Sequence, residues 1–195
     1  MESQNKVMNR NSPVPELPLA EAKAVDLPSE KPVVVIVGRP NVGKSTLFNR
    51  IVGKRVSIVT EIAGTTRDRI AMDVSWDNHT FALIDTAGME TSPAGELETR
   101  VQEQVRQALI EADLALFVVD SRAGLLPADE EMAREVRRSG KPVLLVANKT
   151  EEAKEEAQAQ EFYRLGLGEP LLVSAYHNRG TGDRMDRVVQ ALPEA

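Results

Sequence analysis

One segment constrains the fold of this chain more than any other: Gly38-Arg39-Pro40-Asn41-Val42-Gly43-Lys44-Ser45-Thr46. It contains a glycine, four further residues and then Gly-Lys-Ser, the pattern of a loop whose backbone N–H groups surround phosphates. A wholly β-branched run at 33–37 precedes it and predicts a strand buried on both faces. Apolar residues then recur at helical spacing between 47 and 52. Strand, glycine-rich turn and helix are the context that the motif requires; the alternative is an ordinary strand-to-helix turn.

Within this segment, individual side chains have separate expected roles. Lys44 can reach the outer phosphates of a nucleoside triphosphate, and the Ser45 hydroxyl is placed to bind Mg²⁺. The helix N-terminus adds a partial positive charge, which favours a polyphosphate. The residues of this segment that are predicted to contact the nucleotide are Gly38, Asn41, Val42, Gly43, Lys44, Ser45 and Thr46.

Length and composition limit the possible classes of protein. The 195 residues suffice for one well-packed domain, expected at 32–195, after a polar, proline-containing tail at 1–31 that is expected to be flexible. The net charge of −6 and the pI near 5.1 give no generic basic surface for nucleic acid or an anionic membrane. The chain has no cysteine and only two histidines, which disfavours a metal site built from these residues. No apolar run approaches the ~20 residues that a membrane span needs.

Alternating strand and helix patterns predict a three-layer α/β fold of the P-loop NTPase type, with a mainly parallel sheet of six strands. Asp77-Asn78 fits a two-residue hairpin turn, so the strands at 70–76 and 79–84 form the one antiparallel pair. Further strands are expected at 33–37, 114–119, 143–147 and 171–173, and later helices at 128–139, up to about 164, and at 182–192. In such folds, ligands bind at the carboxyl ends of the strands.

The helix expected at 128–139 carries charges that suit its dipole. Acidic residues from Asp129 to Glu131 lie at its start, and arginines from Arg134 to Arg138 lie toward its end. We interpret these charges as a solvated face and not as a binding site.

A second motif, Asp85-Thr86-Ala87-Gly88, closes an expected strand. Asp85 is suited to hold Mg²⁺ directly or through water, and the Gly88 N–H can reach the γ-phosphate. The alternative is a turn in which Asp85 caps a helix. Thr66, in an expected loop at 55–69, can complete the Mg²⁺ shell, although alone it would be an ordinary loop residue.

The order of these motifs resembles that of translation-factor-class GTPases, and most of all the first GTPase domain of the Der (EngA) family of bacterial ribosome-assembly proteins. The resemblance covers about residues 32–192 and rests on Gly38–Thr46, Gly64–Arg69, Asp85–Gly88, Ala112–Leu114, Phe117–Asp120, Asn148-Lys149, Phe162–Pro170 and Ser174-Ala175. It implies a cytoplasmic switch that binds GTP or GDP with Mg²⁺, hydrolyses GTP and acts in assembly of the large ribosomal subunit. Leu165–Pro170 is the stretch that separates Der from the related Era GTPases.

Der proteins carry a second GTPase domain and a KH-like domain after this one, whereas this sequence ends at Ala195. An excised domain, a fragment and a shortened homologue all fit this difference. Without the KH-like region, we expect no evident nucleic-acid surface within the chain.

The resemblance also assigns the residues that recognise the base. Asn148 would connect the segment Gly38–Thr46, called the phosphate loop below, to the base. The Lys149 stem would cover the purine face, and Ala175 of Ser174-Ala175 would donate its N–H to guanine O6. The family has aspartate where this chain has Glu151. Each charge-assisted hydrogen bond from guanine is worth roughly 1.5–3 kcal/mol, so the longer side chain either relaxes guanine selectivity or is accommodated by the loop. Alternatively, Glu151 only begins the following helix.

Met89 stands where Ras-like enzymes have the glutamine that orients the attacking water. Methionine can neither orient nor activate water, which predicts slow unaided hydrolysis. GTPases similar to Der use K⁺ near the phosphates, and Asn41 matches the asparagine that coordinates it; the alternative is a turn residue chosen for loop geometry. The expected catalytic residues are Lys44, Thr66 and Asn41.

Two functions therefore remain open. The first is a Mg²⁺-dependent GTPase whose loops at 55–68 and 89–95 are switches. The second is a nucleotide-gated binding module with weak or no hydrolysis and relaxed base choice.

Overall fold

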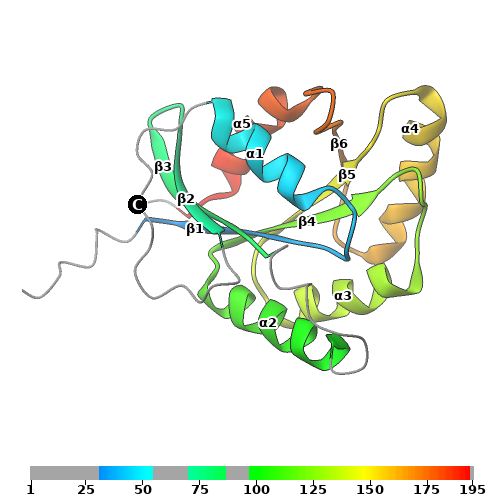
Figure 1. Ribbon diagram of the computed structural model, residues 1–195, viewed down its shortest axis with the longest axis horizontal. Helices are drawn as coiled ribbons and strands as arrows, with labels where there is room; N and C mark the ends of the chain where they lie inside the picture. The colour runs from blue at the N-terminus through cyan, green and yellow to red at the C-terminus, as the bar shows by residue number, and fades with distance from the viewer. Residues whose placement is uncertain (1–30, 55–69, 87–96, 194–195) are drawn as a thin grey trace, which may run out of the picture. The chain divides into compact units, whose positions relative to one another are not determined.

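The computed structural model describes residues 31–54, 70–86 and 97–193 (Figure 1). The strands are β1 (Val33–Val37), β2 (Ile70–Trp76), β3 (His79–Asp85), β4 (Leu114–Asp120), β5 (Val143–Asn148) and β6 (Leu171–Leu172). The helices are α1 (Lys44–Lys54), α2 (Leu97–Glu111), α3 (Pro127–Arg138), α4 (Ala153–Ala159) and α5 (Thr181–Ala191), with a 3₁₀ helix, η2, at Gln160–Leu165. The tail expected at 1–31 lies outside the described residues except for Lys31, so its boundary stays a prediction.

The strands form one six-stranded sheet in the order β2-β3-β1-β4-β5-β6. β2 and β3 pair antiparallel, and the other neighbouring pairs are parallel. The parallel strands therefore end at one edge of the sheet. The register places Ile36 beside Asp85, and Asp120 beside Asn148. The prediction of a mainly parallel six-stranded sheet with one antiparallel pair is confirmed.

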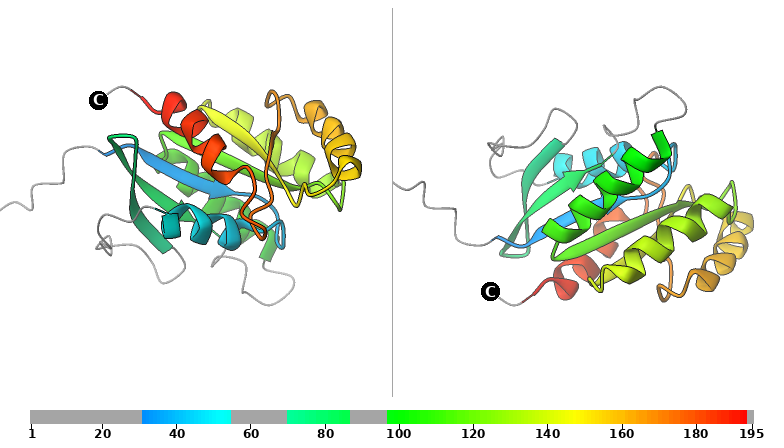
Figure 2. Two further views of the ribbon diagram at one scale, coloured as in Figure 1. Left: turned by 90° about the horizontal axis from the view of Figure 1, so that it is seen from above. Right: turned by 90° about the horizontal axis from the view of Figure 1, so that it is seen from below.

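Helices cover both faces of this sheet. α1 and α5 pack on one face, and α2, α3 and the α4–η2 segment pack on the other (Figures 1 and 2). β4 is buried along its whole length and contributes to both cores, Leu116 to the first and Phe117 to the second. Because both faces are covered, polar side chains concentrate at the strand ends, where ligands bind in folds of this class.

The details of two connections follow from local backbone geometry. Asp77 and Asn78 have φ values of 45° and 63°, the left-handed pair that a tight hairpin turn requires. The prediction of one helix up to about residue 164 is wrong, because α4 gives way to η2 after Ala159 and Gly166, with φ 70°, ends it. The tighter 3₁₀ turn buries Phe162 and Leu165, three residues apart, on one side. The other predicted boundaries lie within one residue of those observed.

Candidate nucleotide-binding site

The segment Gly38–Thr46 joins β1 to α1 and is closely packed at its two glycines. A Cβ on Gly38 would lie 2.5 Å from the Val118 carbonyl oxygen of β4, and one on Gly43 would lie 2.2 Å from Asn148 Nδ2. Gly43 also has a φ of +97°, which disfavours any side chain. Close packing therefore requires glycine at both positions, which explains the two glycines of the motif.

Lys44, the first residue of α1, is turned back onto this loop. It is only 3% exposed, and its Nζ donates to the carbonyls of Gly38 at 2.7 Å and Arg39 at 2.9 Å. Main-chain oxygens thus solvate a buried ammonium group, which concentrates positive charge inside the turn. Ser45 is exposed beside it, and Thr46 lines the cavity described below.

Asp85 and Thr86 lie next to the phosphate loop because β3 is a neighbour of β1. Asp85 is 2% exposed and pairs in register with Ile36, whose carbonyl accepts a hydrogen bond from Thr86 Oγ1 at 2.7 Å. The register therefore brings the predicted Mg²⁺ residue to the end of the strand that leads into the loop. Thr66 and Gly88, which were predicted for the site, and Met89 lie outside the described residues.

Asn148, the last residue of β5, bridges two loops. Its Nδ2 donates to the Val42 carbonyl at 2.9 Å, and its Oδ1 accepts the Ala175 N–H at 3.0 Å. The Ala175 N–H, which the motif resemblance assigned to guanine O6, is thus engaged within the protein. The 174–179 loop is itself closed by reciprocal main-chain bonds between Ser174 and Arg179. One buried amide side chain therefore holds the phosphate loop and the Ser174-Ala175 loop together.

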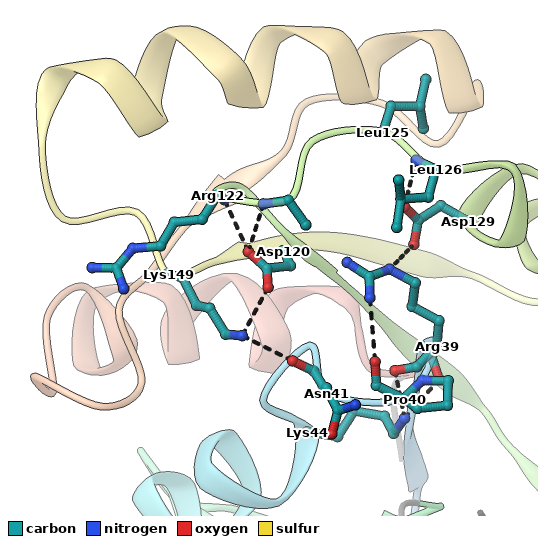
Figure 3. A network of polar contacts seen from close by, with 12 residues as sticks. Arg39, Pro40, Asn41, Lys44, Asp120, Arg122, Leu125, Leu126, Asp129 and Lys149 are labelled. Carbon is teal, nitrogen blue, oxygen red and sulfur yellow. Dashed lines mark hydrogen bonds and ion pairs between the residues drawn. The ribbon is translucent and has the colours of Figure 1, made fainter.

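Lys149 extends this bridge to β4 (Figure 3). Its Nζ donates to the Asn41 carbonyl at 2.8 Å and to Asp120 Oδ2 at 2.7 Å. Asp120 Oδ1 accepts the N–H groups of Arg122 and Ala123 at 2.9 and 3.1 Å. Burial acts to raise the pKa of Asp120, but the Lys149 ammonium and these two amides outweigh it, so the pKa lies below its ordinary value of 3.8.

A cavity of about 370 Å³ opens between the phosphate loop and the ends of β5 and β6. It is lined by Gly43, Thr46, Arg122, Asn148, Lys149, Glu151, Ser174, Tyr176 and His177. A larger cavity, of about 810 Å³, lies at the opposite end of the strands from the phosphate loop, between the β2–β3 turn and the end of α5. It contains none of the motif residues, so we assign the site by its chemistry and not by its size.

Glu151 lines the smaller cavity and is held from two sides. Its Oε2 accepts from Arg122 Nη2 at 2.5 Å, and its Oε1 lies 3.4 Å from both Ser174 Oγ and His177 Nε2. Glu152, not Glu151, is the N-cap of α4. Glu151 therefore lies just before the cap and does not itself begin α4, and whether it contacts a base stays a prediction.

Two arginines that the sequence reasoning missed support this cavity. Arg122 follows β4 and reaches Glu151, as described above. Arg50 of α1 donates from Nε to the Ala175 carbonyl at 2.8 Å and from Nη2 to the Tyr176 carbonyl at 2.7 Å. Neither arginine differs in local sequence from one on a solvated surface, so only the folded arrangement reveals these contacts.

The solvated face predicted for α3 is wrong at Asp129. This side chain is 0% exposed, and its Oδ1 faces the guanidinium of Arg39 with Nε at 3.3 Å (Figure 3). Its Oδ2 accepts the Leu126 N–H at 3.0 Å. Burial raises the pKa of Asp129, while the Leu126 N–H and Arg39 oppose that rise. The neighbouring Glu130, Glu131 and the later arginines are exposed, as predicted.

A glycine-rich loop with a buried lysine, an aspartate on the adjacent strand and an Asn-Lys pair bonded to that loop define the class: a P-loop nucleotide-binding domain of the GTPase type. The chain belongs to the family of 50S ribosome-binding GTPases, whose family model matches residues 33–149.

Curated relatives agree with this assignment. The GTPase Der of Moorella thermoacetica is 54% identical over 163 residues, and that of Pelotomaculum thermopropionicum is 55% identical over 163 residues. Each alignment covers 84% of this chain and 37% of the relative, so the chain spans about 37% of the length of the curated relatives it matches. The resemblance to Der that the motifs indicated is confirmed.

Solved structures of Era GTPases share the architecture. Era of Aquifex aeolicus bound to GDP·AlF4⁻ gives a TM-score of 0.68 at 32% identity, over 86% of this chain and 58% of that chain. Era in complex with MgGDPNP and part of 16S ribosomal RNA gives a TM-score of 0.66 at 30% identity, and the match covers 85% of this chain and 59% of that chain. None of the helices in the described part of this chain has the length and apolar character to cross a bilayer.

Proposed function

We propose that this chain binds and hydrolyses GTP and works as a guanine-nucleotide switch. The observation that carries the proposal is the pair of hydrogen bonds made by the Asn148 side chain, which donates to the Val42 carbonyl and accepts from the Ala175 N–H. A phosphate-binding turn and a second loop joined by one side chain, with a cavity between them, form a single site of nucleotide size. Relatives named GTPase Der and the family description support guanine as the base.

In this proposal, the phosphates are held by the backbone N–H groups of the phosphate loop and the N-terminus of α1. Lys44 exchanges its bonds to the loop carbonyls for bonds to the outer phosphates. Mg²⁺, when bound, neutralises phosphate charge, with Ser45, Asp85 and Thr66 as its protein ligands and Gly88 donating to the γ-phosphate. The described donors fit: both are oxygens, which Mg²⁺ prefers, and Asp85 adjoins the strand that leads into the loop.

For the base, the proposal assigns the Lys149 stem to the purine face and the Glu151 carboxylate to guanine N1–H and N2–H₂. Arg122, bonded to Oε2 of Glu151, supports the longer side chain in the place of an aspartate. On the base side of the cavity, Ser174 Oγ contacts Glu151, and the Ala175 N–H donates to Asn148 Oδ1.

For hydrolysis, we assign catalytic roles to Lys44, Thr66 and Asn41, with K⁺ near the phosphates and Asn41 among its ligands. The Asn41 carbonyl is held by Lys149, which fixes the backbone beneath an exposed side chain. Its φ of 66° also suits asparagine for turn geometry alone. A comparison of potassium and sodium buffers separates the two roles.

We infer that the large ribosomal subunit is the partner of this switch, and hence that it acts in the cytoplasm. The support is the family description, 50S ribosome-binding GTPase, and the similarity to Der proteins over 84% of this chain. The ribosomal role belongs to relatives that are longer than this chain, so it is tested separately from nucleotide binding.

The test combines titration and turnover. Labelled GTP, GDP and ATP are titrated against the protein, and phosphate release is then measured in K⁺ and in Na⁺. We expect GTP and GDP to bind, ATP to compete poorly, and release to be faster in K⁺. ATP that competes as well as GTP would refute the guanine assignment, and equal rates in both salts would refute the potassium role. Tight GTP binding without turnover in either salt would refute hydrolysis and favour the binding module.

A further inference from the structure

Arg39 is the second residue of the phosphate loop, yet its side chain is not among those that line the nucleotide cavity. It runs instead to the first turn of α3 (Figure 3). The Arg39 side chain is 13% exposed, its Nε lies 3.3 Å from Asp129 Oδ1, and its Nη1 donates to the Pro40 carbonyl at 3.3 Å. Within the described residues, Nε and Nη2 have no hydrogen-bond partner of good geometry. The ion pair with Asp129 is therefore the main compensation for a buried positive charge.

Asp129 attaches this arginine to a helix. Its side chain is 0% exposed, and its second oxygen, Oδ2, accepts the N–H of Leu126, the N-cap of α3. The carboxylate is thus fixed to the start of α3 while it faces the loop. Loss of either partner would leave the other charge buried and unpaired, which is strongly unfavourable. The phosphate loop and α3 are consequently joined by a contact that is costly to break.

The backbone beside Arg39 is the part of the loop that holds the catalytic lysine. The carbonyls of Gly38 and Arg39 each accept a hydrogen bond from Lys44 Nζ. Gly38 has no free space on its Cβ side, because Val118 lies there. With one end packed on β4 and the other attached to α3, the position of this peptide depends on Asp129.

We propose that Asp129 is a positioning residue for nucleotide binding: acting through Arg39, it sets the geometry of the phosphate loop and couples that loop to α3. This inference rests on the nucleotide site proposed above. It requires phosphate affinity to change when the pair is broken, although neither side chain lines the nucleotide cavity.

The first test is Asp129→Asn, which keeps the shape of the side chain and an acceptor for Leu126 but removes the charge. The dissociation constants of labelled GDP and GTP, the KM and kcat of GTP hydrolysis and the unfolding temperature are measured. We expect the dissociation constants and KM to rise about tenfold and kcat at saturation to stay within about threefold. The matched control is Glu135→Gln on the same helix, which removes the ion pair with Arg106, a side chain that is 54% exposed, and leaves nucleotide binding unchanged.

A second variant separates positioning from stability. Arg39→Met/Asp129→Leu replaces both charges by apolar side chains, a change that often preserves stability. We expect wild-type unfolding temperature with nucleotide affinity as weak as in Asp129→Asn. A double variant that binds GDP like wild type, or an Asp129→Asn protein that matches Glu135→Gln, would overturn the inference alone. A wild type that binds neither nucleotide would overturn the proposed function as well.

Discussion

Gly43 and Asn148 are in such close contact that a Cβ on the glycine would lie 2.2 Å from the amide nitrogen of the asparagine. The same amide donates to the Val42 carbonyl at 2.9 Å. β5, which ends in Asn148, is separated from β1 by β4 in the sheet. The contact therefore holds the phosphate loop, which follows β1, against the end of β5, two strands away in the sheet. It leaves no room for a methyl group on Gly43.

Gly43→Ala is expected to disturb this closure. The left-handed backbone alone should lower the free energy of unfolding by about 1–2 kcal/mol, and displacement of Asn148 should weaken GDP binding. Urea unfolding and GDP titration measure the two effects. Gly53→Ala in α1 is the control, because a Cβ there meets nothing within 4 Å; it should stabilise by roughly 0.5–1 kcal/mol. Shifts of the same sign for both variants would contradict the packing argument.

Glu151→Gln is expected to reduce guanine selectivity. The variant keeps the length of the side chain but loses the anion, and roughly 1.5–3 kcal/mol per charge-assisted hydrogen bond corresponds to a tenfold or greater loss of GTP affinity. ATP affinity should hardly change, so competition between the two nucleotides is the measurement. Glu152→Gln, at the exposed N-cap of α4, serves as the control. If Glu151→Asp binds GTP severalfold more tightly, position 151 contacts the base, whereas identical selectivity in all variants would remove Glu151 from the base site.

Asp120→Asn should reveal the lowered pKa of Asp120 as a pH-dependent stability difference. Because the folded-state pKa is below the ordinary 3.8, the charged group stabilises the fold above its unfolded pKa, and this contribution disappears as the pH falls through the folded value. We expect wild type to exceed the variant by about 1–2 kcal/mol at neutral pH and the difference to shrink below pH 3.8. Urea unfolding across this range provides the test; a difference that grows on acidification would have the wrong sign.

Arg50→Met should loosen the loop that carries Ser174 and Ala175. The methionine retains an apolar stem but loses both hydrogen bonds to the Ala175 and Tyr176 carbonyls. We expect the binding free energy of GDP to weaken by roughly 1 kcal/mol, which is about fivefold in affinity, mainly because GDP dissociates faster. Stopped-flow release of labelled GDP measures it, with Arg187→Met on the exposed side of α5 as the comparison. Equal release rates for the two variants would show that Arg50 does not support the site.

The fold was predictable because its signals are local. Five consecutive β-branched residues at 33–37 can only be satisfied in a strand covered on both faces, and β1 is such a strand. Asp77-Asn78 has the residue types that a left-handed turn requires. In a parallel sheet these elements bring Lys44, Asp85 and Asn148 to one edge, so most of the described candidate site followed from chain order alone.

The supporting charges were not predictable in this way. Asp129 has the sequence position of an ordinary acid in the first turn of a helix, and its burial depends on Arg39, which is distant in the chain. Glu151 likewise could have begun a helix, but the cap falls on Glu152 and Arg122 holds Glu151 at the cavity. No periodicity distinguishes a solvated charge from a buried one that has found a partner.

Backbone preferences and hydrophobic periodicity act over a few residues, so the linear chain was sufficient to establish the strands, the phosphate loop and the class of ligand. The pairing of charges depends on through-space distance and on exclusion of water, and both exist only after the sheet has assembled. Arg39 with Asp129, Arg122 with Glu151 and Lys149 with Asp120 are therefore properties of the folded protein.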